Sequence, residues 1–240
     1  MTTADRWTQA VRNQLGLGRL LPLGGARDGA WISEKAAEAV LKRAAEDMRG
    51  VRLGTLRIAL TDPEDAQEAA VPPPPSALPP GPLRVTADFA ATATEPLPAT
   101  ADRLRELLAA AATERLGLTV TEVDLRVTAL LDDDVEPAPV RQPEPAQAAA
   151  PGNPDEERVC AAAQAVPGVT RLTGALGGLA RAVHIEERQD EAALPHRHAR
   201  VEIAVSADHR AVEVAREVRR KAGAALPDHP TVAVLVTAVG

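Results

Sequence analysis

A histidine pair in the last third of the chain carries the most obvious potential for chemistry. His196 and His198 are two positions apart, and side chains at that spacing point to one face of a strand, which can suit zinc. Neither His184 nor His209 supplies a third ligand at a recognisable spacing. The pair follows Pro195 at a predicted turn, where polar side chains are normally solvated. We therefore predict no metal site, and a metal-dependent hydrolase that uses His196 and His198 stays as an alternative.

The other candidates for chemistry are a lone cysteine and an acidic run. Cys160 falls on the predicted buried side of a helix among alanines, which is typical of a core thiol. Being single, it forms no disulfide within the chain and fits a reducing compartment. The acidic residues of 132–136 lie in a Pro-rich stretch and are interpreted as a solvated charge run. We predict no catalytic residues and no cofactor.

A glycine-rich segment near the N-terminus raises the question of a phosphate loop. Its glycines neither follow a predicted strand nor precede a Lys-Ser/Thr pair, so the pattern does not match such a loop. The glycines are Gly16, Gly18, Gly24 and Gly25. Three leucines between them either form an exposed patch for a partner or seal the core under Trp7, and we favour sealing because small modules need apolar cover. The leucines are Leu20, Leu21 and Leu23.

Charge and composition disfavour nucleic acid as a partner. The formal net charge of the 240 residues is −7, whereas nucleic-acid binding relies on lysine and arginine to neutralise phosphates. Two tryptophans, one phenylalanine and no tyrosine leave few platforms for stacking bases. No apolar run approaches the ~20 residues of a membrane-spanning helix, and no basic region followed by an apolar stretch marks a secretion signal. We expect a cytoplasmic protein without direct membrane insertion.

Composition divides the chain into four parts. Residues 1–29 are expected to form a helical arm and a loop, residues 30–131 a first module, residues 132–154 a disordered linker, and residues 155–240 a second module. A Pro-rich insertion at 62–82 interrupts the first module, and because proline lacks an N–H donor we expect an extended, mobile surface loop there.

Each module has the same predicted order of elements: helix, strand, strand, helix, strand. Ser33 is the predicted N-cap of the first helix, with a stop at Gly50, and Asn153 followed by Pro154 begins the corresponding helix of the second module. Alternating apolar residues define the expected inward faces of the later strands. These residues are Leu83, Val85, Ala87 and Phe89, then Val123, Leu125, Val127 and Ala129, and then Val201, Ile203 and Val205.

The repeated order predicts an α+β fold built from two tandem modules. Each is expected to be a small mixed sheet with helices on one face, and the two are expected to pack as a pseudo-twofold pair because homologous modules reuse a self-complementary surface. The gap from the Gly-Val pair to the second strand is similar in the two copies, which favours duplication over coincidence.

This arrangement resembles the alkaline shock protein family, also called the envelope stress response family. In the second module the resemblance is carried by Ala161–Val169, Val201–Val205, Ala211–Val218 and Thr231–Val239, and in the first by Ile32–Val51, Arg84–Phe89 and Val123–Val127. The first module departs from the family in having Arg49 where proline is usual, and in its long insertion. The resemblance implies a fold without enzyme activity and a role in envelope homeostasis through protein partners.

The sequence therefore predicts a non-enzymatic protein-interaction or scaffold protein of the cell-envelope stress response. The expected partner is a protein, either a small membrane-anchored one or a paralogous module, and a homo-oligomer stays open. Such a partner would place this cytoplasmic chain at the inner face of the membrane. Besides the hydrolase that uses His196 and His198, a nucleic-acid-binding module is the second alternative, because this order of elements also occurs in RNA-binding modules.

Overall fold

The computed structural model describes residues 17–132, 140, 143–176, 180–189 and 195–240 as an α+β fold with two mixed sheets, as predicted. The first half contains β1 (Leu20–Pro22), β2 (Ala30–Ser33), α2 (Glu34–Glu46), β3 (Val51–Leu60), the 3-10 turn η1 (Pro63–Asp65), β4 (Leu83–Thr92), α3 (Leu97–Ala110), the π-helical turn η2 (Ala111–Leu116) and β5 (Val120–Leu131). The second contains α4 (Pro154–Gln164), β6 (Val169–Leu172), β7 (Val183–Arg188), β8 (His196–Val205), α5 (Ala211–Ala224) and β9 (Thr231–Val239).

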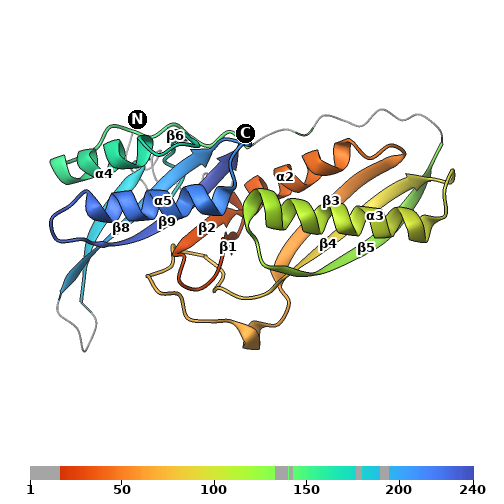
Figure 1. The fold of residues 1–240 in the computed structure, drawn as a ribbon, viewed down its shortest axis with the longest axis horizontal. Coiled ribbons are helices and arrows are strands. Elements are labelled where there is room, and N and C mark those ends of the chain that lie inside the picture. The colour runs from red at the N-terminus through yellow and green to blue at the C-terminus, as the bar shows by residue number, and fades with distance from the viewer. Residues whose placement is uncertain (1–16, 133–139, 141–142, 177–179, 190–194) are drawn as a thin grey trace, which may run out of the picture.

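The two sheets differ in size but share one pairing pattern. The smaller sheet has the order β3-β4-β5, with β3 antiparallel and β5 parallel to β4. The larger has the order β1-β2-β9-β8-β6, with β7 also paired to β8. Within it β6 is antiparallel and β9 parallel to β8, as in the smaller sheet. Helices α2 and α3 lie over the smaller sheet, and α4 and α5 over the larger (Figure 1).

Helix ends follow the local signals in the sequence. Ser33 is the N-cap of α2, and its hydroxyl accepts a hydrogen bond from Ala36 N. The Asn153 side chain accepts from two backbone N–H groups at the start of α4. Beyond these helices, Gly50 and Gly168 have φ of 71° and 89°, a region that glycine enters at low cost. Both predicted N-caps are confirmed, and α2 ends shortly before Gly50 as predicted.

A bulged threonine occupies matching positions in the two halves. Thr128 in β5 and Thr237 in β9 each fall at a shift in the pairing register. Each hydroxyl donates to a carbonyl of the neighbouring strand, Phe89 O at 3.2 Å and Ile203 O at 3.1 Å. The same irregularity of pairing and the same side-chain hydrogen bond therefore occur in both halves.

The second helix of each half also repeats a contact to the following strand. Arg105 Nε in α3 donates to Val123 O at 3.2 Å, and Arg219 Nε in α5 donates to Val232 O at 3.2 Å. The shared pairing pattern, the bulge and this arginine support the predicted repeat, but the second half contains one strand more than predicted, because both β6 and β7 lie between α4 and β8. The pseudo-twofold packing of the modules stays a prediction.

The larger sheet takes strands from both ends of the sequence, which local pattern did not predict. Leu20–Pro22, expected in a loop, forms β1, and Ala30–Ser33, assigned to the first module, forms β2. Strand β2 pairs in parallel with β9, with Trp31 opposite Leu235. Pairing between residues some 200 positions apart leaves no local signal, because it depends only on which edge remains open after the modules fold.

The Pro-rich insertion packs on the sheet, contrary to the expected mobile loop. Val71 is buried in a cluster with Trp31 and Leu235, on the sheet face opposite the helices. Trp31 Nε1 donates to Leu78 O at 3.1 Å, and Leu78 N donates to Leu20 O at 2.8 Å. The apolar side chains on that face require cover, and the insertion provides it.

The end of the expected disordered linker also has partners. Ala149 N donates to Ala180 O at 2.7 Å, and Gly174 N donates to Ala146 O at 3.1 Å. Ala148 packs against the main core. Residues 146–149 therefore lie along the second module, while residues 133–139 and 141–142 are outside the described part of the chain.

The two bulged threonines provide a matched test of their side-chain hydrogen bonds. Thr237 is buried and its hydroxyl also lies 2.8 Å from Thr173 Oγ1, whereas Thr128 is exposed. Thr237→Val leaves buried polar partners unsatisfied and is expected to lower the free energy of unfolding by about 1–3 kcal/mol, against under ~1 kcal/mol for Thr128→Val. Urea unfolding of both variants checks this, and equal losses would contradict the assigned hydrogen bonds.

Candidate functional site

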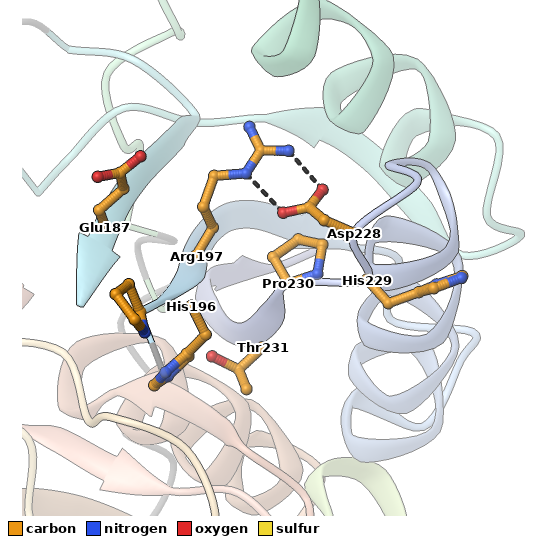
Figure 2. Close-up of a pocket in the computed structure, with 8 residues that line it drawn as sticks. Glu187, His196, Arg197, Asp228, His229, Pro230 and Thr231 are labelled. Atoms are coloured by element: carbon orange, nitrogen blue, oxygen red, sulfur yellow. Dashed lines mark hydrogen bonds and ion pairs between the residues drawn. The ribbon is translucent and has the colours of Figure 1, made fainter. Parts of the chain in front are cut away.

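A surface pocket of about 480 Å³ lies at the end of the larger sheet, between the start of β8 and the loop that precedes β9 (Figure 2). Arg197 on its lining binds two carboxylates, and Glu187 on the same lining is a third. Arg197 Nε donates to Asp228 Oδ2 at 2.6 Å. Arg197 Nη1 donates at 2.5 Å to Oδ2 of Asp155, which lies at the start of α4. The guanidinium lowers the pKa of both carboxyls below their usual value. The arginine ties three elements together and leaves neither carboxylate poised as a base.

The structure separates the environments of the two candidate metal histidines. His196 lines the pocket, but His198 is buried and its Nδ1 lies 2.8 Å from Thr231 Oγ1. Burial lowers the pKa of His198 to about 4, so it is neutral at pH 7. The expectation that both histidines are solvated is wrong for His198, because loops and neighbouring strands cover this part of β8.

Further metal ligands do not gather around the pair in the part of the chain that the structure describes. No group of three or more His, Cys, Asp or Glu residues there is placed to hold a metal ion. His184 lies on β7 opposite Arg200, and burial lowers its pKa. His209 lies in the turn before α5, where its N–H donates to Ser206 O.

The remaining predicted candidates take structural positions. Cys160 is half-buried on α4 against the main core, and burial raises its pKa to about 11, so the thiol is protonated at neutral pH. In the acidic run, Asp132 is exposed, and residues 133–136 lie outside the described residues. The leucines seal the core as predicted, and Gly18 and Gly24 adopt positive φ, while Gly16 and Trp7 are outside the described residues. These leucines are Leu20, Leu21 and Leu23.

A buried carboxylate on β8 escaped the sequence analysis. Glu202 is fully buried, and its Oε2 accepts hydrogen bonds from Ala175 N at 2.7 Å and Leu176 N at 3.0 Å. The nearest cation is Arg200, whose Nε lies 3.9 Å from Oε1. Burial raises the pKa of Glu202 to about 7. Alternation of apolar residues along β8 assigned Glu202 to solvent, because the loop that covers this face has no signal in the strand itself.

The elevated pKa of Glu202 predicts a pH dependence of stability. An unfolded chain loses this proton near pH 4.5, whereas the folded protein keeps it until about pH 7. Between these values the folded state binds more protons, so the free energy of unfolding falls as pH rises, and it levels off above about pH 7. Relative to Glu202→Gln, wild-type protein is expected to lose on the order of 2 kcal/mol from about pH 5.5 to about pH 8. Urea unfolding across this range checks the slope, and parallel curves would refute it.

The outer edge of β5 is the strongest candidate for an interaction site. Strand β5 pairs with β4 alone, so within the described residues no strand covers its other side. The hydrogen bond from Arg105 Nε to Val123 O shows that the Val123 carbonyl points away from β4. Because backbone groups alternate along a strand, those of Leu125 and Val127 point outward as well. Such an edge can accept another strand.

Apolar side chains accompany this open edge. Val127 is 40% exposed and Leu130 is 63% exposed, and these are the large hydrophobic residues that remain exposed among those described. Val123 and Leu125 are half-buried against the core, so the predicted inward face ends midway along β5. The expectation that Val127 and Ala129 face the core is wrong, because both are exposed in the last part of the strand.

The second module shows how the equivalent edge is used. There β9 corresponds to β5, and β2 pairs in parallel with the outer edge of β9. Val234 N donates to Gly29 O at 2.9 Å next to this pairing. By the matching bulges and arginines, Val234 is the counterpart of Leu125. One edge is therefore filled within the chain, and no described strand fills the corresponding edge of β5.

The solvent face of the smaller sheet consists of paired charges. Arg84 Nε donates to Glu122 Oε2 at 2.6 Å and lies 3.4 Å from Asp124 Oδ2. Arg126 binds Asp88 through two hydrogen bonds of 2.8 and 3.1 Å and lowers the pKa of that carboxyl. These exposed pairs contribute little to stability. They make the solvent-facing side of β5 polar in its middle, whereas the ends of the strand carry apolar residues.

Comparison of the chain with protein-family models and with curated proteins finds no match. The observations thus define a class by structure alone, an α+β protein with two mixed sheets and a duplicated strand edge. The resemblance to alkaline shock proteins stays a prediction. In the described part of the chain, no helix is both long and apolar enough to cross a membrane.

Proposed function

We propose that this chain is a non-enzymatic protein-interaction protein that binds its partner by strand addition at the outer edge of β5. The observation that carries the proposal is the contrast between two equivalent edges, β9 paired with β2 and β5 paired with no described strand on that side. Backbone hydrogen bonds along an open edge supply affinity, and contacts with alternate side chains supply specificity. Val127 and Leu130 offer such apolar contacts.

The environments of the chemically active side chains favour binding over catalysis. Arg197 engages Asp155 and Asp228, and Cys160 has a raised pKa. The hydrolase alternative depends on His196 and His198, yet His198 is buried, neutral and hydrogen-bonded to Thr231. The nucleic-acid alternative requires cations available to phosphates; Arg84 and Arg126 are paired with carboxylates, Arg52 and Arg57 on β3 are exposed, and the formal net charge of −7 disfavours such a partner. Neither alternative gains support from the site.

A role in envelope homeostasis follows from the family resemblance. The resemblance assigns the chain to the cytoplasm, with peripheral attachment to the inner membrane face through a partner. The partner class is a small membrane-anchored protein or another copy of the module. The order helix, strand, strand, helix, strand in the first half, and the same order with one additional strand in the second, supports the resemblance, and the open edge supports an interaction role.

A lysine at the edge tests the proposed site. Val127→Lys places a charge among the apolar contacts of an incoming strand, so it is expected to reduce capture of a membrane partner from native membranes at least tenfold. Thr55→Lys is the matched control, because Thr55 is exposed on β3 of the same sheet. Captured proteins are quantified by mass spectrometry against both variants. Capture unaffected by Val127→Lys, or a wild-type chain that neither captures a protein nor self-associates, would contradict the proposal.

Metal content distinguishes the hydrolase alternative. Purified wild-type protein is expected to contain zinc well below one equivalent. The Nδ1 of His198 is engaged with Thr231, and among the described residues no group of three or more His, Cys, Asp or Glu is placed to hold a metal ion. Elemental analysis before and after chelation gives the measurement. Stoichiometric zinc that disappears in the double variant His196→Ala/His198→Ala would favour the hydrolase.

A further inference from the structure

We infer that the partner at the β5 edge is β5 of a second copy of this chain, paired antiparallel about a two-fold axis through Leu125. The inference rests on the proposed function, since it names the occupant of the same edge. Pairing of this kind would join two three-stranded sheets into one six-stranded sheet, in the order β3-β4-β5 and then its reverse. It would also leave no β5 edge open, because a two-fold contact closes on itself.

Backbone direction fixes which residues can pair across the axis. The outward groups belong to Val123, Leu125 and Val127, as the Arg105 hydrogen bond and strand alternation indicate. A two-fold axis through Leu125 sets Leu125 against its own copy and Val123 against Val127 of the partner subunit. Every residue in these pairs presents its N–H and C=O outward. The Val123 carbonyl has two lone pairs and can keep Arg105 while it accepts from the new strand.

Side chains along β5 complement themselves in this register. Asp124 lies opposite Arg126 of the partner subunit, and Arg126 lies opposite the partner's Asp124. Within each chain Asp124 is 3.4 Å from Arg84, and Arg126 binds Asp88. The pairing would therefore link the existing ion pairs into an alternating row across the axis, and opposite charges directly across an antiparallel pair are favourable.

The apolar positions match in the same register. Val127, which is 40% exposed, would cover Val123 of the partner subunit, and Leu130, which is 63% exposed, would lie against the partner's Val120. The two exposed hydrophobic residues of the described chain thus both find apolar partners. A shift by one residue would oppose outward and inward backbone groups and lose these matches.

A second copy fits this edge better than a strand like β2 does. Where β2 meets β9, the facing residues on both strands are apolar, with Ala30, Trp31 and Ile32 opposite Val234, Leu235 and Val236. On β5 the counterparts of these β9 residues include Arg126, which stands beside Asp124 and Thr128. An apolar parallel strand would leave the alternating charges unmatched, whereas an antiparallel copy matches them.

Crosslinking tests the position of the axis. In a Cys160→Ala background, Leu125→Cys is expected to form a disulfide-linked dimer under a mild oxidant, because paired residues there have Cα atoms about 5.5 Å apart. Thr121→Cys is the control, since its position lies four residues from the axis and would be far from its own copy. Non-reducing electrophoresis of the full chain gives the readout. Equal crosslinking at both positions, or at neither, would overturn the register.

Charge exchange between two variants tests the pairing without relying on a cysteine. Asp124→Arg alone sets Arg against Arg across the axis, and Arg126→Asp alone sets Asp against Asp. Each is expected to weaken dimerisation by about tenfold, judged from cross-strand and surface ion-pair energies. A mixture of the two variants restores opposite charges at both positions and is expected to recover the wild-type dimer. Sedimentation velocity over a concentration series distinguishes the 25.1 kDa monomer from the dimer.

The outcomes separate this inference from the proposed function. A wild-type dimer, lost in each charge variant and recovered in the mixture, supports the two-fold pairing. A wild-type monomer at every concentration overturns it. If that monomer still captures a membrane protein and Val127→Lys abolishes the capture, the edge binds a different protein and the proposed function stands. A monomer with no capture refutes both.

Discussion

The parallel pairing of β2 with β9 is the interaction on which the rest of the structure depends. It joins a strand near the N-terminus to the last strand of the chain, and it brings Ser33 to the bulge in β9. The Ser33 hydroxyl accepts from Ala36 N to begin α2 and donates to Thr237 O at 3.2 Å. One residue therefore connects the first helix of the first half to the last strand of the second half.

This pairing also determines which surfaces remain available. By filling the outer edge of β9, β2 allows that strand to be buried along nearly its whole length. The insertion and the loop at Ala175 then cover the opposite face of the larger sheet, where Glu202 is enclosed. Among the described residues the smaller sheet has no equivalent of β2, so β5 keeps an exposed edge there, and ion pairs lie on the solvent face of the sheet. The two halves thus differ mainly in how much of each sheet is covered by other segments of the chain.

Local features of the fold could be predicted from the sequence, and long-range cover could not. Ser33 and Asn153 cap the N-terminal ends of helices through hydrogen bonds to residues two or three positions away, so their residue types alone identify the caps. The burial of His198 and Glu202 depends on segments distant in sequence. The alternation of apolar and polar residues along a strand therefore does not predict it. For the same reason Val127 was assigned to the core although it is 40% exposed, and that error concealed the candidate site.

Amide hydrogen exchange at the two equivalent edges tests the central claim, that the edge filled within the chain at β9 is filled by a second molecule at β5. The amides of Val234 and Val236 are expected to be protected at every protein concentration, because β2 covers them. Those of Leu125 and Val127 are expected to gain protection as concentration rises and to lose it on dilution. Exchange at Leu125 and Val127 that is independent of concentration and of added partner would contradict the account.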